Sequence, residues 1–414
     1  MSCPRWKITK TNGATSSKDC ICEAGYYGHD NDDECSLCPV GILCNQPGLP
    51  SSQLGPADGY YIIPNTTITH KCPENACEPN SINKCKIEYQ GFLCATCSPQ
   101  YYRKMNARTY DKVECKPCDN TKYPSYADLI IVMLLWILIL FYFVRQNLNS
   151  IKESRKRIEL SKSRKNLLLS EPMKTAILER LLLSHLQILA ILGKFEWKWP
   201  DEIQLLLTSI DWISSLGPTT NLGVGGGVFC LLYPANIPLP VNDVIMNVVV
   251  LLLCFVFVIA FWYFYYYITK NIDTVGRKQR IIITILFITF LIYSRVIKSF
   301  FQLFSCTKFD GDKVLRLRNA LDVKCYEREH VFYLFVVGIP TAVILIALPG
   351  IAVLKLLKEV HGEGLTNAYN VETYGFIYDG YQLRFWLVVY VVIFLNVIII
   401  IIFILLSFYL VIYI

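Results

Sequence analysis

The stretches Cys20-Ile-Cys-Glu-Ala-Gly-Tyr-Tyr-Gly28 and Gly91-Phe-Leu-Cys-Ala-Thr-Cys97 decide how the first part of this chain folds. Each places cysteines close together beside Gly and aromatic residues, and thirteen of the seventeen cysteines lie before residue 119. A segment with so few apolar residues cannot build a large core, so cross-links must hold it. Because disulfides persist in oxidising compartments, we expect residues 1–120 to form a small disulfide-rich extracellular or luminal domain of short β hairpins.

A zinc site is the alternative use of these cysteines. Cys94-x-x-Cys97 followed by Cys115-x-x-Cys118 fits the spacing of a four-cysteine zinc site. The density of cysteines favours disulfides instead, so we expect neither a metal nor a cofactor. The disulfide candidates are Cys20, Cys22, Cys35, Cys38, Cys44, Cys72, Cys77, Cys85, Cys94, Cys97, Cys115, Cys118, Cys306 and Cys325.

The odd number of cysteines in residues 1–120 calls for one distant partner. Cys306 and Cys325 bracket a loop that the topology below places outside, where the two can pair. Cys230 lies in another outer loop, so thirteen cysteines plus these three make an even sixteen. The unpaired cysteine could therefore join Cys230, or Cys3 could have its partner before the start of the chain.

Beyond residue 126 the sequence consists of apolar runs of about twenty residues, the length that a helix needs to cross a bilayer. The global values, 53% hydrophobic residues and a net charge of +7, would also suit a soluble protein, so the distribution decides. We expect an all-α polytopic membrane domain of about six transmembrane helices. A first helix at 127–145 and a basic loop at 146–175 precede a multi-pass region at 176–414, with spans near 176–194, 243–268, 280–302, 331–356 and 385–414.

Lys and Arg residues in the connections predict the orientation. The loop 146–175 is strongly basic, which marks it as cytosolic, and the connection 270–280 is basic as well. The N-terminus then lies outside, in the plasma membrane or another membrane of the secretory pathway. The first residues lack an apolar signal segment, and 385–414 is one apolar run without a tail, so we expect a truncated piece of a longer protein.

The motifs resemble two families. The stretches quoted above and Cys35-Ser-Leu-Cys-Pro-Val-Gly41 resemble the ephrin-receptor-like repeats, related to laminin EGF-like modules, of large surface proteins of ciliates and other protists. Tyr293-Ser-Arg-Val-Ile-Lys298 and Tyr374-Gly-Phe-Ile-Tyr-Asp-Gly380 resemble the transient-receptor-potential-like (TRP-like) membrane segment that often follows such repeats. The resemblance implies a multi-pass surface protein with EGF-like repeats, and cation conduction as its activity.

Two groups of residues are candidates for lining a pore or cavity. Glu179, Arg180 and His185 interrupt the second expected span, and ionisable groups at membrane depth are costly unless they face a cavity or a bundle interior. A second group, Thr219, Gly225 and Gly227, follows a short apolar segment, which is the layout of a carbonyl-lined selectivity filter. Ordinary packing of His185 and an ordinary outer loop are the alternatives.

Two functions of different classes follow. The first is a TRP-like cation channel or transporter subunit whose cysteine-rich head senses or tethers; the second is a receptor or adhesion protein anchored by its helices. Enzymatic chemistry is not expected, because the five histidines form no metal-binding pair and no phosphate loop is present. Expected partners are the lipid bilayer, an extracellular protein or glycan and a second copy of the chain, but no nucleic acid. Asn65 in Asn65-Thr-Thr67 is a glycosylation sequon.

Overall fold

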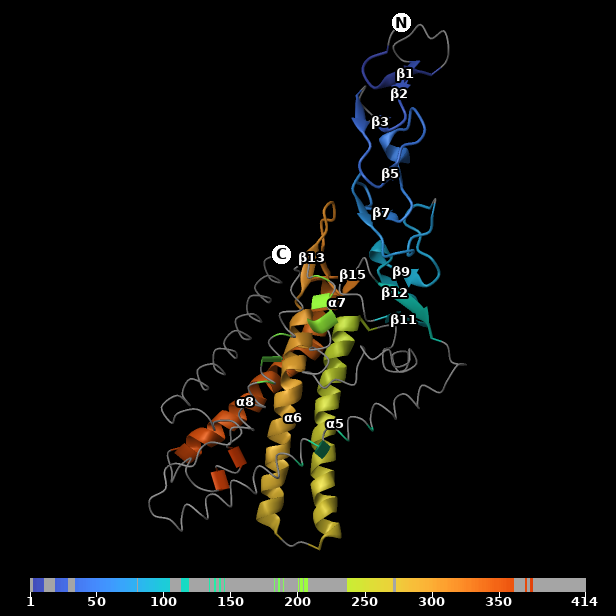
Figure 1. Cartoon of the computed structure of the whole chain (residues 1–414). Coiled ribbons are helices and arrows are strands. Elements are labelled where there is room, and N and C mark those ends of the chain that lie inside the picture. The colour runs from blue at the N-terminus through green and yellow to red at the C-terminus, as the bar shows by residue number, and fades with distance from the viewer. Residues whose placement is uncertain are drawn as a thin grey trace. The chain divides into compact units, whose positions relative to one another are not determined.

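The structure, a computed structural model, describes residues 3–10, 19–28, 34–79, 81–104, 113–118, 237–270 and 273–360, with isolated positions between 134 and 207 and between 369 and 374 (Figure 1). The chain divides into two compact units. The first contains the described residues from Cys3 to Cys118, here called the head, residues 237–239, and residues 305–330, here called the α6–α7 loop. The second contains the long helices. We describe each unit by itself.

The head is a series of short antiparallel hairpins, as the sequence predicts. Consecutive strands of two to four residues pair with one another, and no strand is long enough to give a continuous sheet among the described residues. The strands are β1 (Lys7–Thr9), β2 (Cys20–Cys22), β3 (Tyr26–Gly28), β4 (Cys35–Leu37), β5 (Ile42–Leu43), β6 (Gly55–Pro56), β7 (Tyr60–Ile62), β8 (Thr69–Lys71), β9 (Tyr89–Gln90), β10 (Thr96–Cys97), β11 (Tyr101–Lys104) and β12 (Glu114–Pro117). Two short 3-10 turns, η2 (Ser51–Gln53) and η3 (Phe92–Cys94), lie between them.

Disulfides join cysteines of the head that are close in sequence. Each bond closes a short loop, which stabilises the fold by about 2–4 kcal/mol, mainly by restricting the unfolded chain. This compensates for apolar clusters as small as Tyr27, Ile42, Cys44, Leu54 and Ile62. The pairs are Cys3–Cys20, Cys22–Cys35, Cys38–Cys44, Cys72–Cys77, Cys85–Cys94 and Cys97–Cys115.

This pairing decides between the alternatives that the sequence leaves open. Cys94 and Cys97 bond to different partners, so the four-cysteine zinc arrangement is not formed. Cys3 has its partner within the chain, so the alternative that its partner precedes the chain is wrong. Cys118 is disulfide-bonded as well, while Cys230, the partner that the cysteine count predicts, lies outside the described residues.

The α6–α7 loop forms a three-stranded antiparallel sheet of β13 (Cys306–Lys308), β14 (Leu315–Leu317) and β15 (Ala320–Lys324), in the order β13-β14-β15. The Cys306–Cys325 disulfide closes it at its base, as the sequence predicts. Leu317 and Val323 are buried beside that disulfide. The register shifts between Arg316 and Leu317, where Arg316 is paired with Lys324 but Leu317 with Ala320. Such a bulge changes the direction in which a side chain points.

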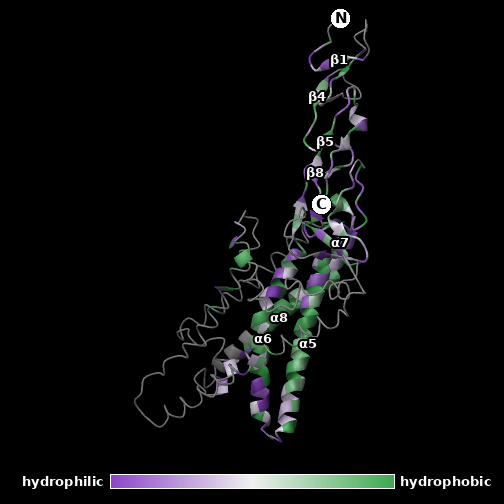
Figure 2. Cartoon of the chain, turned by 45° about the vertical axis from the view of Figure 1, so that its right-hand side comes forward, coloured by the Kyte–Doolittle hydropathy of each residue, from purple (hydrophilic) through white to green (hydrophobic). Residues whose placement is uncertain are grey.

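The second unit contains helices α5 (Leu239–Ile268), α6 (Thr274–Gln302) and α8 (Ile339–Val360), with the short α7 (Arg328–Tyr333) and the π-helical turn η5 (Leu334–Gly338) leading into α8. Within the described part of the chain, three helical segments are long and apolar enough to cross a membrane: Leu239–Ile268, Thr274–Gln302 and Arg328–Ile351. Among these helices, α5 is coloured as hydrophobic along nearly its whole length (Figure 2).

These three segments coincide with the spans expected near 243–268, 280–302 and 331–356. The spans expected near 127–145, 176–194 and 385–414 lie almost entirely outside the described residues, as does the basic loop 146–175.

Helices α5 and α6 are held together by an apolar seam with two polar cross-links. Leu251 and Trp262 of α5 are packed with Ile288 and Val296 of α6. Asn247 Nδ2 donates to Ser299 Oγ at 3.0 Å, and Trp262 Nε1 donates to Thr284 Oγ1 at 3.1 Å. Because a buried donor without an acceptor is costly in an apolar environment, these two bonds fix the register of one helix on the other.

The π turn η5 has a local cause. It ends two residues before Pro340, which has no N–H to donate to the carbonyl four residues earlier. A wider turn at that point accommodates the missing bond, and π turns inside helices are frequently found at functional sites. A second proline, Pro349, lies inside α8.

Peptide mapping without reduction tests the disulfide pattern. After cleavage of the intact protein under acidic conditions that prevent exchange, mass spectrometry should recover the pairs Cys85–Cys94, Cys97–Cys115 and Cys306–Cys325, and should link Cys118 to Cys230. Recovery of Cys94 and Cys97 as free thiols, or their protection by added zinc, would contradict this pairing.

Candidate functional site

Of the sequence-predicted site residues other than the cysteines, the structure describes Asn65 and His185. Asn65 is exposed at the turn between β7 and β8, with φ of 61°, so its side chain is accessible for a glycan. His185 is exposed in a helical position. The other five lie outside the described residues, and their role in a pore or cavity stays a prediction: Glu179, Arg180, Thr219, Gly225 and Gly227.

The best-defined constellation is the contact between the head and the α6–α7 loop, here called the junction. Its apolar centre joins Phe92 and Leu93 of η3 with Phe309 and Leu321 of the loop. Leu93 is fully buried. Phe92 and Phe309 meet edge to face, with ring centroids 5.6 Å apart. Rings in this arrangement contribute about 0.5–1.5 kcal/mol beyond the area that they bury.

A glycine allows the loop to approach the head closely. Gly91 has φ of +78°, and a Cβ atom at this position would collide with the Asp322 carboxylate. In the absence of a side chain there, Asp322 Oδ1 accepts a hydrogen bond of 2.7 Å from the backbone N–H of Phe92. Gly91 therefore has two roles: it allows the turn conformation, and it lets Asp322 reach the backbone of Phe92, from which it is 230 residues distant in the sequence.

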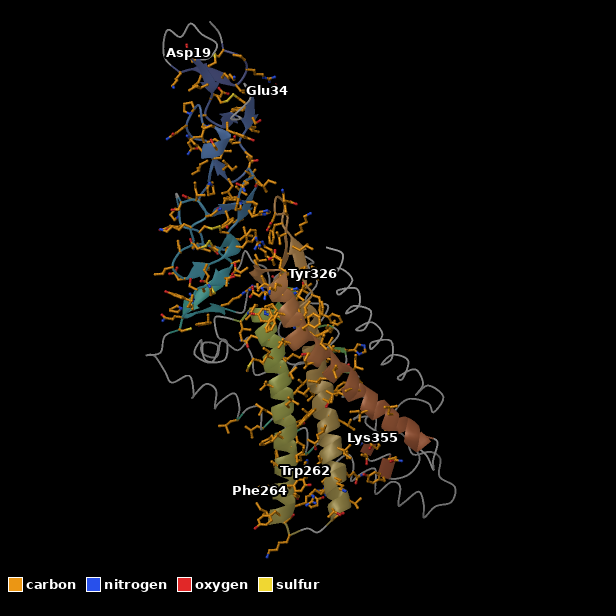
Figure 3. The ribbon with its side chains drawn as sticks, turned by 180° about the vertical axis from the view of Figure 1, so that it is seen from behind. Asp19, Glu34, Trp262, Phe264, Tyr326 and Lys355 are labelled. Carbon is orange, nitrogen blue, oxygen red and sulfur yellow. A yellow bond between two sulfur atoms is a disulfide. The ribbon has the colours of Figure 1, made fainter. Side chains whose placement is uncertain are left out.

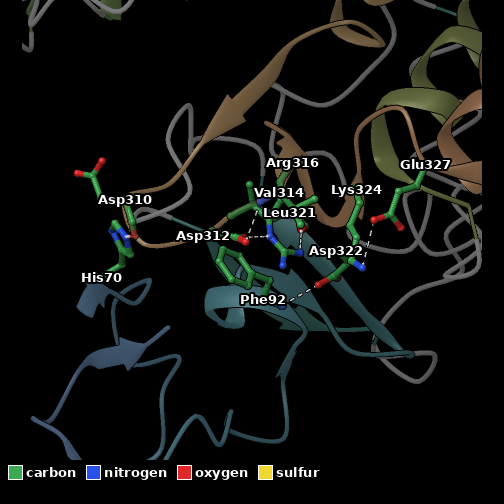
Figure 4. A network of polar contacts seen from close by, with 10 residues as sticks. All are labelled: His70, Phe92, Asp310, Asp312, Val314, Arg316, Leu321, Asp322, Lys324 and Glu327. Atoms are coloured by element: carbon green, nitrogen blue, oxygen red, sulfur yellow. Dashed lines mark hydrogen bonds and ion pairs between the residues drawn. The ribbon is translucent and has the colours of Figure 1, made fainter. Parts of the chain in front are cut away.

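Arg316 fixes the loop side of the junction (Figure 4). Its guanidinium lies over the Phe92 ring, with Cζ 3.7 Å from the centroid. In the plane of the group, Nε donates to Asp312 Oδ2 at 2.6 Å and one Nη donates to the Leu321 carbonyl at 2.9 Å. The Arg316 and Asp312 side chains are only 13% and 12% exposed. Ring stacking with both edges donating is a geometry that Arg allows and Lys does not.

The Asp312 carboxylate is held by a turn of the loop. The backbone N–H of Val314 donates to Asp312 Oδ1 at 3.1 Å. Burial by itself acts to raise the pKa of Asp312, but the hydrogen bonds from Arg316 and Val314 and the charges of Arg316 and Lys324 outweigh it. The pKa of Asp312 therefore lies below its ordinary value.

A second contact anchors the tip of the loop. His70 Nε2 is 2.9 Å from the carbonyl oxygen of Asp310, and because a carbonyl only accepts, Nε2 carries the proton. The His70 ring also meets Phe309 edge-on, with centroids 5.3 Å apart. A Cβ at Gly311 would lie 3.0 Å from Ile68, so the tip packs tightly on the β7–β8 hairpin.

The side chains of the junction hold the α6–α7 loop against the head. Arg316 and Asp312 are engaged with each other and with backbone atoms, and Asp322 accepts a hydrogen bond from the Phe92 N–H. No group of three potential metal ligands occurs among the residues that the structure describes. What the arrangement can do is to keep the α6–α7 loop attached to a particular turn of the head.

Comparison with known proteins gives one distant similarity. The chain is 26% identical over 124 residues to "Cysteine repeat modular protein A" of Toxoplasma gondii, a match that covers 30% of this chain and 3% of that protein. The chain thus corresponds to a small fraction of that relative's length. No protein-family model matches the chain. No solved structure is significantly similar to it.

Together these findings define the class of protein. The chain is a cysteine-rich protein with a disulfide-linked head, similar in part to a protist cysteine-repeat protein. Its apolar helices are those of a membrane protein, and its disulfides are typical of the secretory pathway.

The sequence indicated only part of the junction. The Cys306–Cys325 pair marks a closed loop, and alternation along Leu321-Asp-Val-Lys324 is the pattern of a half-buried strand. Neither signal predicts that the loop packs on Gly91 and Phe92.

Replacing Arg316 tests whether it holds the junction. The Arg316→Gln variant leaves Asp312 without its charged partner in a largely buried position, so we expect the attachment to weaken by about 3 kcal/mol. Hydrogen–deuterium exchange of the full chain in detergent should then show faster exchange in residues 91–95 and 306–325. The matched control is Lys313→Gln, which removes the same charge from an exposed position and should change stability by less than about 0.5 kcal/mol. Equal exchange in the two variants would contradict the assignment.

The lowered pKa of Asp312 predicts an acid-sensitive junction. A carboxyl whose pKa is lower in the folded state contributes its full stabilisation above its unfolded pKa of about 3.9, and loses it as pH falls through the folded value. Protection factors at the junction, corrected for the intrinsic exchange rate, should be constant between about pH 5 and 8 and fall below about pH 4. Asp312→Asn removes this titration, so a pH dependence unchanged in that variant would show that another group is responsible.

Proposed function

We propose that this chain is a membrane protein in which an extracellular or luminal head is coupled to transmembrane helices, and that it acts as a TRP-like cation channel or transporter subunit. The head senses or tethers, and the helices respond. The observation that carries the proposal is the junction, where the loop between α6 and α7 is part of the fold of the head.

The junction favours coupling over simple anchoring. A head that only needs an anchor requires one covalent connection to the membrane. Here the α6–α7 loop is packed on Phe92 and closed by Cys306–Cys325, and its two ends continue directly into α6 and α7. A displacement of the head would therefore act on two helix ends at once. Anchored receptors and adhesion proteins do not need this arrangement, which is why we place that function second.

The helix that follows the loop has features suited to a response. The π turn η5 and Pro349 interrupt the regular hydrogen bonding of the segment that runs from α7 through α8. By contrast, α5 and α6 are joined by two buried polar bonds that fix their register. Because the register of α5 on α6 is fixed while the α7–α8 segment is interrupted, we assign a gating role to α7–α8.

The remaining features belong to the same proposal. The head consists of EGF-like or ephrin-receptor-like repeats, Asn65 carries a glycan, and the partner of the head is an extracellular protein or glycan. The relative's printed name, which describes cysteine repeats and a modular protein, supports the assignment of the head as a cysteine-repeat module. Assembly as a homo-oligomer and the absence of enzymatic activity are parts of the proposal as well.

Current measurements in planar bilayers test the proposal. We expect the purified chain to give unitary cation currents whose open probability changes in Arg316→Gln but not in the exposed control Lys313→Gln. Equal open probability in both variants would refute coupling through the junction. Silence of the wild-type chain, with retained binding of the head to a surface protein or glycan, would favour the receptor or adhesion function.

A further inference from the structure

The turn that joins α5 to α6 carries an excess of positive charge. Between residues 269 and 280 the sequence has four bases, Lys270, Arg277, Lys278 and Arg280, and one acid, Asp273. Asp273 is already engaged, because its carboxylate accepts a 2.9 Å hydrogen bond from the backbone N–H of Gly276 and caps α6. The first two turns of α6 therefore present bases whose charge is not neutralised locally.

Aromatic rings at the end of α5 hold two of these bases. Arg277 lies over the Tyr263 ring, with Cζ 4.3 Å from the centroid. Arg280 lies 5.5 Å from the Trp262 ring and 5.6 Å from the Tyr266 ring. Trp262 and Phe264 are seen at the same end of α5 (Figure 3). A guanidinium placed over a ring does not use its N–H groups for that contact, because the ring meets the face of the group and not its edge.

No acid within the described part of the chain forms an ion pair with Arg277, Lys278 or Arg280. Two polar atoms at this end of the helix pair are buried without a hydrogen-bond partner among the described residues, Arg277 Nε and the Tyr266 hydroxyl. Tyr266 is 3% exposed, and its hydroxyl would lie 3.3 Å from a Cβ at Gly276, so it faces the first turn of α6. Unpartnered donors of this kind indicate that a hydrogen-bond acceptor belongs there.

Positive charge alone has a simpler explanation, which is orientation in the membrane. That explanation requires a number of Lys and Arg residues in the connection but no particular arrangement of them. It accounts neither for two guanidinium groups held on rings nor for the two unpartnered polar atoms. The arrangement is therefore more specific than the requirement for orientation.

We infer that the α5–α6 turn is a binding site for the phosphate of an anionic lipid headgroup, with Arg277 and Arg280 as the principal ligands. Guanidinium groups bind phosphate oxygens through paired N–H donors. The exposed aromatic side chains Tyr263, Phe264 and Tyr267 next to the site suit the boundary between headgroups and acyl chains, where aromatic residues concentrate. Those rings favour a lipid over a soluble phosphate, because a lipid also covers them. The site is independent of the proposed channel function.

Lipid binding to the full chain in nanodiscs tests the site. The quantity to compare is the rise in melting temperature, and the apparent affinity in native mass spectrometry, when a phosphoinositide is added to neutral phosphatidylcholine. We expect the double variant Arg277→Gln/Arg280→Gln to bind the phosphoinositide about 25-fold more weakly, at about fivefold for each charge removed. Each variant is compared with itself in neutral lipid, so that a general loss of stability is not mistaken for a loss of binding.

A charge-conserving variant separates the site from general attraction. Arg277→Lys/Arg280→Lys keeps the net charge but loses the planar groups on the rings, and we expect it to bind at least fivefold more weakly than the wild type. Wild-type affinity in the lysine variant or in the glutamine variant would overturn the proposal. A further measurement adds millimolar inorganic phosphate to the protein in neutral nanodiscs. Stabilisation by free phosphate equal to that by the lipid would show that the ligand is a soluble anion.

Discussion

The guanidinium of Arg316 determines the arrangement of the α6–α7 loop. A charge that is largely removed from water must be paired and fully hydrogen-bonded, or it destabilises the structure around it. The Phe92 ring takes its face, while the Asp312 carboxylate and the Leu321 carbonyl take its edge. The register of β14 shifts directly after Arg316, and the turn at Asp312 is held by the Val314 N–H. The loop therefore has the geometry that allows the Arg316 charge to be buried with these partners.

The head and the helices obtain a defined structure in different ways. The head has apolar clusters of only a few residues, so disulfides between neighbouring cysteines supply the order that a core would otherwise give. The helices have abundant apolar surface but no driving force to separate it from lipid. Asn247–Ser299 and Trp262–Thr284 supply the specificity that apolar contacts lack in a membrane.

Much of this fold could be predicted from local patterns. The density of cysteines indicated short hairpins and disulfides, and the apolar runs located α5, α6 and the segment ending in α8, because length and composition are properties of a single segment. Individual pairings such as Cys85–Cys94 could not be predicted, since many pairings satisfy the same spacing. The junction was beyond local patterns, because Gly91 and Asp322 meet only in the folded chain. The residues predicted for a pore, such as Thr219, lie outside the described residues.

The separation of the two sides of the junction has a consequence for biosynthesis. The chain emerges from the ribosome with its N-terminus first, and the short-range disulfides allow each hairpin of the head to close soon after its synthesis. Phe92 and Leu93, however, pack with Leu321, which is made more than two hundred residues later. Until then these apolar side chains lack their natural cover and are available to chaperones of the secretory compartment. The head can therefore be completed only after the chain has been synthesised beyond the end of α6.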